Sequence, residues 1–139
     1  MQLDRAFILG VAAYLAPTFL IAYFWHLVVF ADKYDALGIY RADVIIPFGL
    51  MAMVLQGCVF SWAYPKLTMG WRGNVVVRGL GYGALLGVLS WTFTTLAVAA
   101  KHPMNDIPAY MVLETLFTVL QFTLAGPLIV LAHRRVLNA

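Results

Sequence analysis

Four long apolar stretches, separated by short polar connections, account for most of this 139-residue chain. They cover approximately residues 6–31, 44–64, 79–100 and 107–132. An α-helix rises about 1.5 Å per residue, so roughly 20 apolar residues cross the hydrocarbon core of a bilayer. Four strands could not close into a barrel, and an open sheet edge leaves backbone groups unsatisfied in lipid. The pattern therefore predicts an all-α protein, an integral membrane four-helix bundle that forms a single domain over residues 1–139.

Two of the predicted helices carry signals for where they start. Asp43 comes just before the second stretch, which contains Pro47, and Asp106 comes just before the fourth, which contains Pro108. Aspartate is a favoured N-cap residue, and proline is tolerated in the first turn of a helix. We therefore expect the second and fourth helices to begin directly after these aspartates.

The chain is 63% hydrophobic and 11% charged, and its basic residues are unevenly distributed. Six of the nine Lys and Arg residues are expected on the side of the chain termini, namely Arg5, Lys66, Arg72, Arg78, Arg134 and Arg135. The other three, Lys33, Arg41 and Lys101, are expected on the opposite side. Cytoplasmic connections are enriched in Lys and Arg, so both termini are predicted to be cytoplasmic. No basic run is interleaved with aromatic residues, so we expect contact with membrane lipids and none with nucleic acid.

Small or polar residues recur at a spacing of three or four in each stretch, and such residues share one face of a helix. They are Tyr14, Thr18, Ala22 and His26; Gly49, Met53, Gly57 and Ser61; Gly79, Gly83, Gly87, Ser90 and Thr94; and Tyr110, Glu114, Thr118, Gln121 and Ala125. In lipid, helices associate through close backbone approach and interhelical hydrogen bonds. Gly79, Gly83, Gly87, Gly57 and Ser61 are therefore predicted to lie at helix contacts, either within the bundle or against a partner.

Three polar side chains are predicted to lie near the middle of the membrane-spanning helices. Gln56, Thr118 and Gln121 are expected to form interhelical hydrogen bonds near the middle of the membrane. Together with Glu114 they could also line a polar path for transport, although four helices would need a dimer for alternating access.

Glu114 is the only acidic residue well inside a predicted span. An ionisable group at such depth costs about 2.5–3.5 kcal/mol, so it normally faces the interior and has a partner. His26, Thr94 and Arg41 fall near the same end of the bundle. The residues predict either a polar site open to the outer face, with Glu114 as proton acceptor or ligand and His26 as its partner, or a structural contact that fixes helix register.

Signals for other chemistry are missing from the sequence. Cys58 is the single cysteine, and there is no His-x3-His or Glu-x2-His spacing. We therefore predict no metal and no cofactor. There is no phosphate-binding loop, dinucleotide fingerprint or Gly-x-Ser-x-Gly motif, which weighs against an enzyme.

A set of residues in the first half of the chain resembles small bacterial four-span membrane proteins of unknown function. The residues are Phe24-Trp25-His26, Phe30, Tyr34, Arg41, Pro47, Gln56 and Trp62-Ala63-Tyr64. The resemblance implies a four-helix bundle in the bacterial inner membrane, crossed several times by the chain. It implies no reaction and no catalytic residue.

Three functions fit these features. The first is a non-enzymatic accessory or scaffold subunit of a larger membrane complex, favoured by the glycine stripe and by the scarcity of ionisable residues in the spans. The second is a membrane protein that handles a small molecule, ion or proton at His26 and Glu114, either as a transporter or as an enzyme. The third is a protein that binds lipid or pigment.

Overall fold

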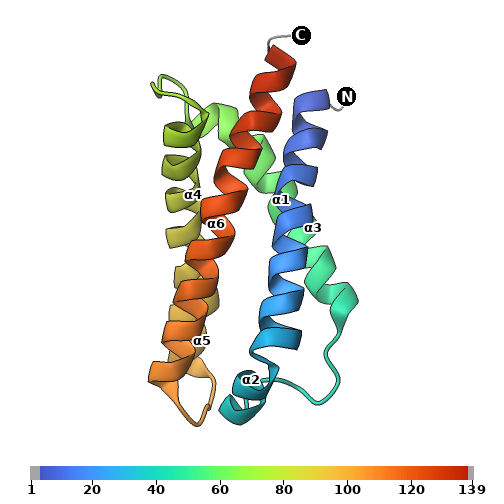
Figure 1. Ribbon diagram of the computed structural model, residues 1–139, viewed down its shortest axis with the longest axis vertical. Coiled ribbons are helices and arrows are strands. Elements are labelled where there is room, and N and C mark those ends of the chain that lie inside the picture. Colours follow the sequence, from blue (N-terminus) through green and yellow to red (C-terminus); the bar gives the residue numbers. More distant parts are fainter. Residues whose placement is uncertain (1–3, 138–139) are drawn as a thin grey trace.

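The structure is a computed structural model, which describes the backbone of residues 4–137 and the side chains of residues 4–134. Within this range it consists of helices and contains no strand (Figure 1). The elements are α1 (Arg5–Phe24), the π-helical turn η1 (Trp25–Val29), α2 (Ala31–Leu37), α3 (Ile46–Leu67), α4 (Val75–Trp91), the π-helical turn η2 (Thr92–Leu96), α5 (Ala97–Lys101) and α6 (Ile107–Leu137).

Four helical segments are long and apolar enough to cross a membrane, namely Arg5–Val29, Ile46–Leu67, Val75–Lys101 and Ile107–Arg134. The predicted all-α bundle with four spans is thus confirmed. The third span begins a turn earlier than predicted, because the side chain of Asn74 accepts a hydrogen bond from the backbone N–H of Val77 at 2.9 Å and caps the helix there.

The two aspartates expected to cap helices behave differently. Asp106 accepts a hydrogen bond from the backbone N–H of Ala109 at 2.9 Å, as predicted for an N-cap. The prediction for Asp43 is wrong, since α3 begins at Ile46. A helix capped by Asp43 would need the residue at position 47 to donate to the Asp43 carbonyl, and Pro47 has no N–H. Proline instead lies within the first two positions of α3, where no donor is required.

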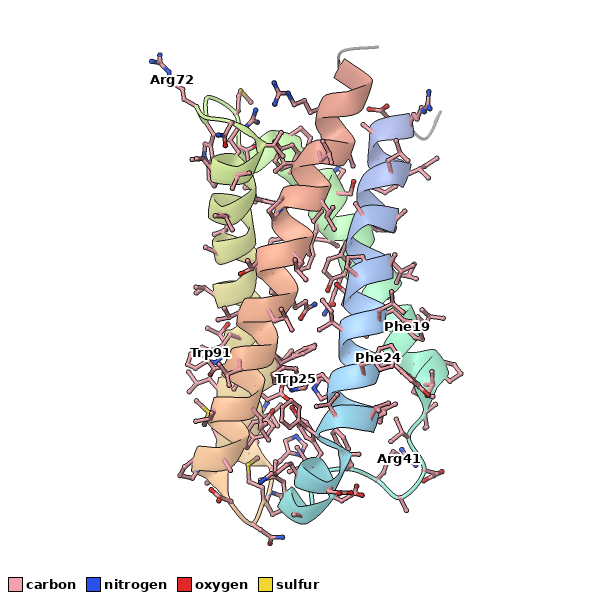
Figure 2. The ribbon with its side chains drawn as sticks, in the orientation of Figure 1. Phe19, Phe24, Trp25, Arg41, Arg72 and Trp91 are labelled. Carbon is pink, nitrogen blue, oxygen red and sulfur yellow. The ribbon has the colours of Figure 1, made fainter. Side chains whose placement is uncertain are left out.

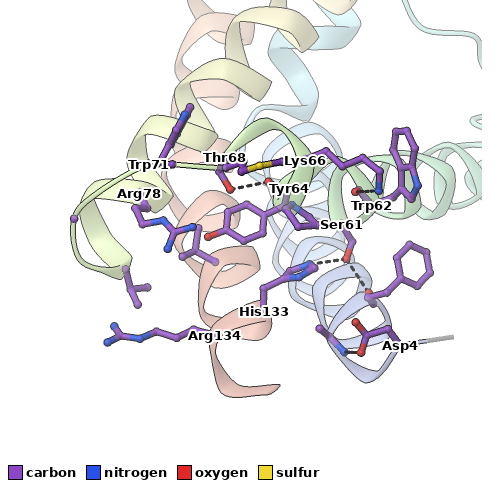
Figure 3. A pocket seen from close by; sticks show the side chains of 18 residues that line it. Asp4, Ser61, Trp62, Tyr64, Lys66, Thr68, Trp71, Arg78, His133 and Arg134 are labelled. Carbon is purple, nitrogen blue, oxygen red and sulfur yellow. Dashed lines mark hydrogen bonds between the residues drawn. The ribbon is translucent and has the colours of Figure 1, made fainter. Parts of the chain in front are cut away.

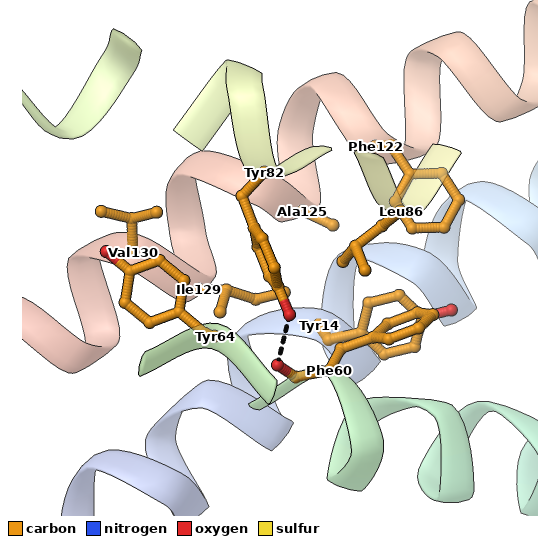
Figure 4. Close-up of a cluster of buried hydrophobic side chains, with 9 residues drawn as sticks. All are labelled: Tyr14, Phe60, Tyr64, Tyr82, Leu86, Phe122, Ala125, Ile129 and Val130. Atoms are coloured by element: carbon orange, nitrogen blue, oxygen red, sulfur yellow. Dashed lines mark hydrogen bonds between the residues drawn. The ribbon is translucent and has the colours of Figure 1, made fainter. Parts of the chain in front are cut away.

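The helices pack in the order α4, α6, α1, α3, so that α6 lies between α1 and α4 while α3 packs mainly on α1 (Figure 1). A cluster of buried apolar and aromatic side chains joins all four (Figure 4). Within it the hydroxyl of Tyr82 on α4 donates to the Phe60 carbonyl on α3 at 2.7 Å, which satisfies a polar group buried in the core.

Close backbone approach defines the contact between α4 and α6. A Cβ atom added to Gly79 would collide with the backbone of Pro127, and one added to Gly83 would collide with the Phe122 carbonyl. Gly126 on α6 faces the backbone of Gly79 and Gly83 in return. The predicted glycine stripe is therefore used inside the bundle, which removes one reason to expect a partner on this face.

The chain termini and the α3–α4 connection lie at one end of the bundle, named the terminal end below (Figure 1). Helix α2 and the α5–α6 connection lie at the other, the far end, together with Arg41 (Figure 2). The assignment of the terminal end to the cytoplasm stays a prediction.

Helix α3 is packed along only half of its length. Its buried residues, Gly57, Phe60, Ser61, Ala63 and Tyr64, all belong to the half nearer the terminal end. Towards the far end α3 diverges from α1 (Figure 1), and a Cβ added to Gly49 would meet no atom of a neighbouring helix. Gly49 was expected on a packed face, but the divergence of α3 leaves it exposed.

Candidate functional site

The far-end cluster consists of Glu114, His26, Tyr34 and Tyr40. The carboxylate of Glu114 on α6 accepts a hydrogen bond from the Tyr34 hydroxyl at 2.6 Å, and the same oxygen lies 3.2 Å from Nε2 of His26. Only 8% of Glu114 is exposed. The structure therefore brings His26 and Glu114 together and adds a third member, Tyr34, which sequence reasoning did not identify.

Local structure places each ring of the cluster. His26 lies in the π-helical turn η1, where its Nδ1 is 3.0 Å from the carbonyl of Ala22. Helix α2 ends at Leu37 and is followed by its C-cap Gly38, whose φ of 72° is a left-handed conformation that glycine adopts without strain. The chain turns there, and the ring of Tyr40 stacks on that of Tyr34 with centroids 5.1 Å apart.

These contacts determine how many protons the His26–Glu114 pair holds. A carbonyl oxygen only accepts, so Nδ1 of His26 must carry a proton. The contact between Nε2 and the Glu114 oxygen then needs one further proton, either on the imidazole as an ion pair or on the carboxyl group as a neutral pair. The pair therefore shares one proton between Nε2 of His26 and the Glu114 carboxylate.

The two tyrosines remain neutral beside this pair. Burial raises the pKa of Tyr34 well above its ordinary value, and the charge of Glu114 raises it further. Burial and Glu114 likewise raise the pKa of Tyr40. Tyr34 is thus a permanent hydrogen-bond donor to the carboxyl group rather than a competing acid.

An apolar pocket of about 410 Å³ opens next to the cluster, between the far-end halves of α1 and α3. His26, Tyr40 and Arg41 provide its polar wall, and apolar residues such as Phe19 and Met53 line the remainder. A small molecule with an apolar body and a polar head would fit such a pocket. Sequence reasoning missed the pocket because it depends on the divergence of α3.

Two residues predicted for the polar site do not contact Glu114 in the structure. The prediction for Thr94 is wrong: its side chain is exposed and donates to the Ser90 carbonyl at 2.9 Å. The π-helical turn η2 adds a residue to the turn and rotates the following positions, so Thr95 is buried instead. Arg41 lines the pocket but contacts Asp43 at 3.5 Å and not Glu114.

A hydrogen-bonded chain crosses the middle of the bundle at the glutamines. The Tyr14 hydroxyl donates to Gln56 on α3 at 2.7 Å and accepts from Gln121 on α6 at 3.2 Å. Gln121 also lies 3.5 Å from the hydroxyl of Thr18, and Thr118 is buried one turn away on α6. The two glutamines thus form interhelical hydrogen bonds, with Tyr14 as the link that the sequence did not reveal.

A second histidine contact lies at the terminal end. The hydroxyl of Ser61 donates to the Phe7 carbonyl at 2.8 Å, and Nε2 of His133 lies 3.1 Å from the same hydroxyl oxygen. Because the hydroxyl proton is directed to Phe7, His133 must donate to Ser61 and cannot accept its proton. This arrangement does not activate a serine nucleophile, which requires the histidine as base.

Within the described part of the chain, no three His, Cys, Asp or Glu side chains gather as metal ligands. No family model, no curated protein and no solved structure matches the chain. The resemblance to small bacterial membrane proteins therefore stays a prediction.

Proposed function

We propose that this protein, a multi-pass membrane protein by its four candidate spans, binds a small amphiphilic molecule in the far-end pocket and exchanges a proton with its polar head. The observation that supports the proposal is the 3.2 Å contact between Nε2 of His26 and the Glu114 carboxylate, with His26 forming part of the pocket wall. Arg41 at the same wall favours a head that can carry negative charge.

The pocket and the pair have separate tasks in this proposal. The apolar lining encloses the body of the ligand, while Tyr40 and Arg41 offer hydrogen bonds to the head. Glu114 is held by Tyr34, and both nitrogens of His26 are engaged, so the head would exchange the proton of the pair by taking the place of one of the His26 contacts.

A calorimetric titration of the protein in lipid nanodiscs with para-decylphenol, which has one hydroxyl and an apolar tail, tests the proton exchange. Repeating it in buffers of different ionisation enthalpy gives the number of protons exchanged on binding. Glu114→Gln keeps the shape and still accepts from Tyr34 but takes up no proton, so we expect the exchange to be abolished. Thr94→Val, at the same end but outside the site, should match the wild type. Equal proton numbers in wild type and Glu114→Gln would refute the proposal.

Filling the pocket tests where the molecule binds. Gly49→Phe places a ring in the pocket from a position where a Cβ meets nothing, so folding should be retained. We expect binding of para-decylphenol to weaken roughly tenfold or more, since about 1.4 kcal/mol of lost contact has that effect. Val54→Phe, which adds the same ring to the exposed face of α3, is the matched control. Undiminished binding in Gly49→Phe would exclude this pocket.

A second proposal is the accessory subunit, supported by the unpacked half of α3. Phe48 and Met51 there are 64% and 56% exposed, and a helix of a larger complex could pack on them. Purification from the native membrane in mild detergent should then yield a stoichiometric complex, and Phe48→Ala with Met51→Ala should weaken it. A free protein of protomer mass under the same conditions would contradict this role.

A further inference from the structure

At the terminal end, a pocket of about 820 Å³ lies between the ends of α1, α3 and α6 and the start of α4 (Figure 3). Its lining includes the cationic side chains of Lys66, Arg78 and Arg134 and a single carboxylate, Asp4. We propose that this pocket binds a phosphate-bearing anion through Arg78. The proposal concerns the opposite end of the bundle and does not depend on the function of the far-end cluster.

Arg78 is the residue on which the proposal rests. Its Nε is buried, and among the described residues it has no hydrogen-bond partner. A buried donor without an acceptor costs free energy, so water or an anion is expected at this guanidinium group, which lines the pocket. The guanidinium group also lies over the ring of Tyr64, 5.7 Å from its centroid, which fixes its direction inside the pocket (Figure 3).

The other charged residues of the pocket, Asp4 and Lys66, are engaged elsewhere and do not contact Arg78. Asp4 accepts a hydrogen bond from the backbone N–H of Ala6 at 3.1 Å and caps α1. Lys66 donates to the Trp62 carbonyl at 3.3 Å, and its ammonium group lies over the Trp62 ring. Within residues 4–134 the side-chain ion pairs are elsewhere, at His26–Glu114 and Arg41–Asp43. The pocket lining therefore carries an excess of positive charge, with Lys66, Arg78 and Arg134 against Asp4.

The surroundings favour phosphate over a smaller anion. A guanidinium group matches the geometry of phosphate oxygens and binds them with charge-assisted hydrogen bonds. Gly73 and Val75 bring the start of α4, the positive end of its dipole, to the pocket rim. The volume also leaves space for groups attached to the phosphate, beside the aromatic ring of Trp71. Either an anionic phospholipid headgroup or a free phosphate has this chemistry.

Two arms of one experiment distinguish the two sources. In the first, the protein is purified from nanodiscs containing phosphatidylglycerol and phosphatidylcholine, and the retained lipid is counted by native mass spectrometry. In the second, nanodiscs of phosphatidylcholine alone are titrated with inorganic phosphate and thermal unfolding is followed. Retention of phosphatidylglycerol assigns the site to a lipid headgroup, whereas stabilisation by inorganic phosphate alone assigns it to a free anion. The absence of both effects would overturn the proposal.

Arg78→Gln should reduce the effect seen in either arm roughly tenfold or more, because it removes a charge-assisted contact. Arg72→Gln is the matched control, since Arg72 lies at the same end but points away from the bundle (Figure 2). Equal losses in both variants would show a general surface-charge effect and overturn the proposal. Should Arg78→Gln fail to insert, Arg78→Lys replaces it, and binding equal to wild type in that variant would also count against the site.

Discussion

The two outer interfaces of the bundle, α4–α6 and α1–α3, are built from similar residues but differ in how they close. At α4–α6 the glycines meet backbone on the opposite helix, and Gly57 in the packed half of α3 meets Val11 on α1, whereas Gly49 in the far-end half of α3 meets nothing. Both helices carry a glycine-containing stripe at helical spacing. The difference shows that a small residue permits close approach but does not cause it, because the facing helix must offer a matching surface. The open interface is where the far-end pocket forms.

The largest expected effect on stability comes from adding a side chain at the closely packed α4–α6 interface. Gly83→Leu places a side chain against the Phe122 carbonyl and Gly126, which cannot move without separating α4 from α6. We expect a loss of about 3 kcal/mol in the free energy of unfolding, the upper range for overpacking a core. Thermal and denaturant unfolding in detergent micelles would measure it.

Gly49→Leu is the matched partner of that variant. It adds the same side chain on the open side, where we expect unfolding to be unchanged within about 0.5 kcal/mol. If both variants unfolded alike, the contrast between a closed and an open interface would be wrong.

A smaller effect is expected from the polar link between α3 and α6. Tyr14→Phe removes the hydroxyl that joins Gln56 on α3 to Gln121 on α6. The loss should be about 1 kcal/mol, in the range of interhelical hydrogen bonds in membranes. Hydrogen exchange should rise more in α3 than in α4, since α3 packs mainly on α1. Tyr23→Phe, at an exposed position of α1, is the control.

The smallest effect concerns alkaline pH at the far end. Because the pKa values of Tyr34 and Tyr40 are raised above 10.0, the folded protein holds their protons while the unfolded chain releases them. Stability contributed by the neutral phenols is therefore complete below pH 10 and falls as pH rises above it. Replacing both tyrosines by Phe should flatten this decline, measured as the midpoint of thermal unfolding against pH. An unchanged slope would contradict the burial of the two phenols.

Sequence reasoning predicted the features that depend on one helix at a time. The length of each apolar stretch gives the spans, and the depth of Glu114 in its span required a partner, which His26 provides. The stripe on α6 is buried throughout, because an uninterrupted helix keeps its spacing.

Features that depend on two elements together could not be predicted in the same way. Tyr34 reaches Glu114 only because the chain after η1 folds into α2, and no periodic pattern specifies that turn. Gly126 stands alone on α6, and its role is seen only opposite Gly79 and Gly83. Thr95 is buried in place of the predicted Thr94 because η2 interrupts the α-helical spacing.

The π-helical turns η1 and η2 also affect how this chain should be compared with others. Each contains one residue more than an α-helical turn would, and both lie in the far-end halves of their spans (Figure 1). In a relative with unbroken α-helices, residues at the same aligned position would be structurally equivalent to those of this chain from the terminal end only as far as these turns. Beyond them, equivalent residues differ by one position, so an alignment without a gap would pair Thr94 with the residue that occupies the place of Thr95. Two single-residue gaps inside apparently continuous helices would therefore be the mark of such a relative.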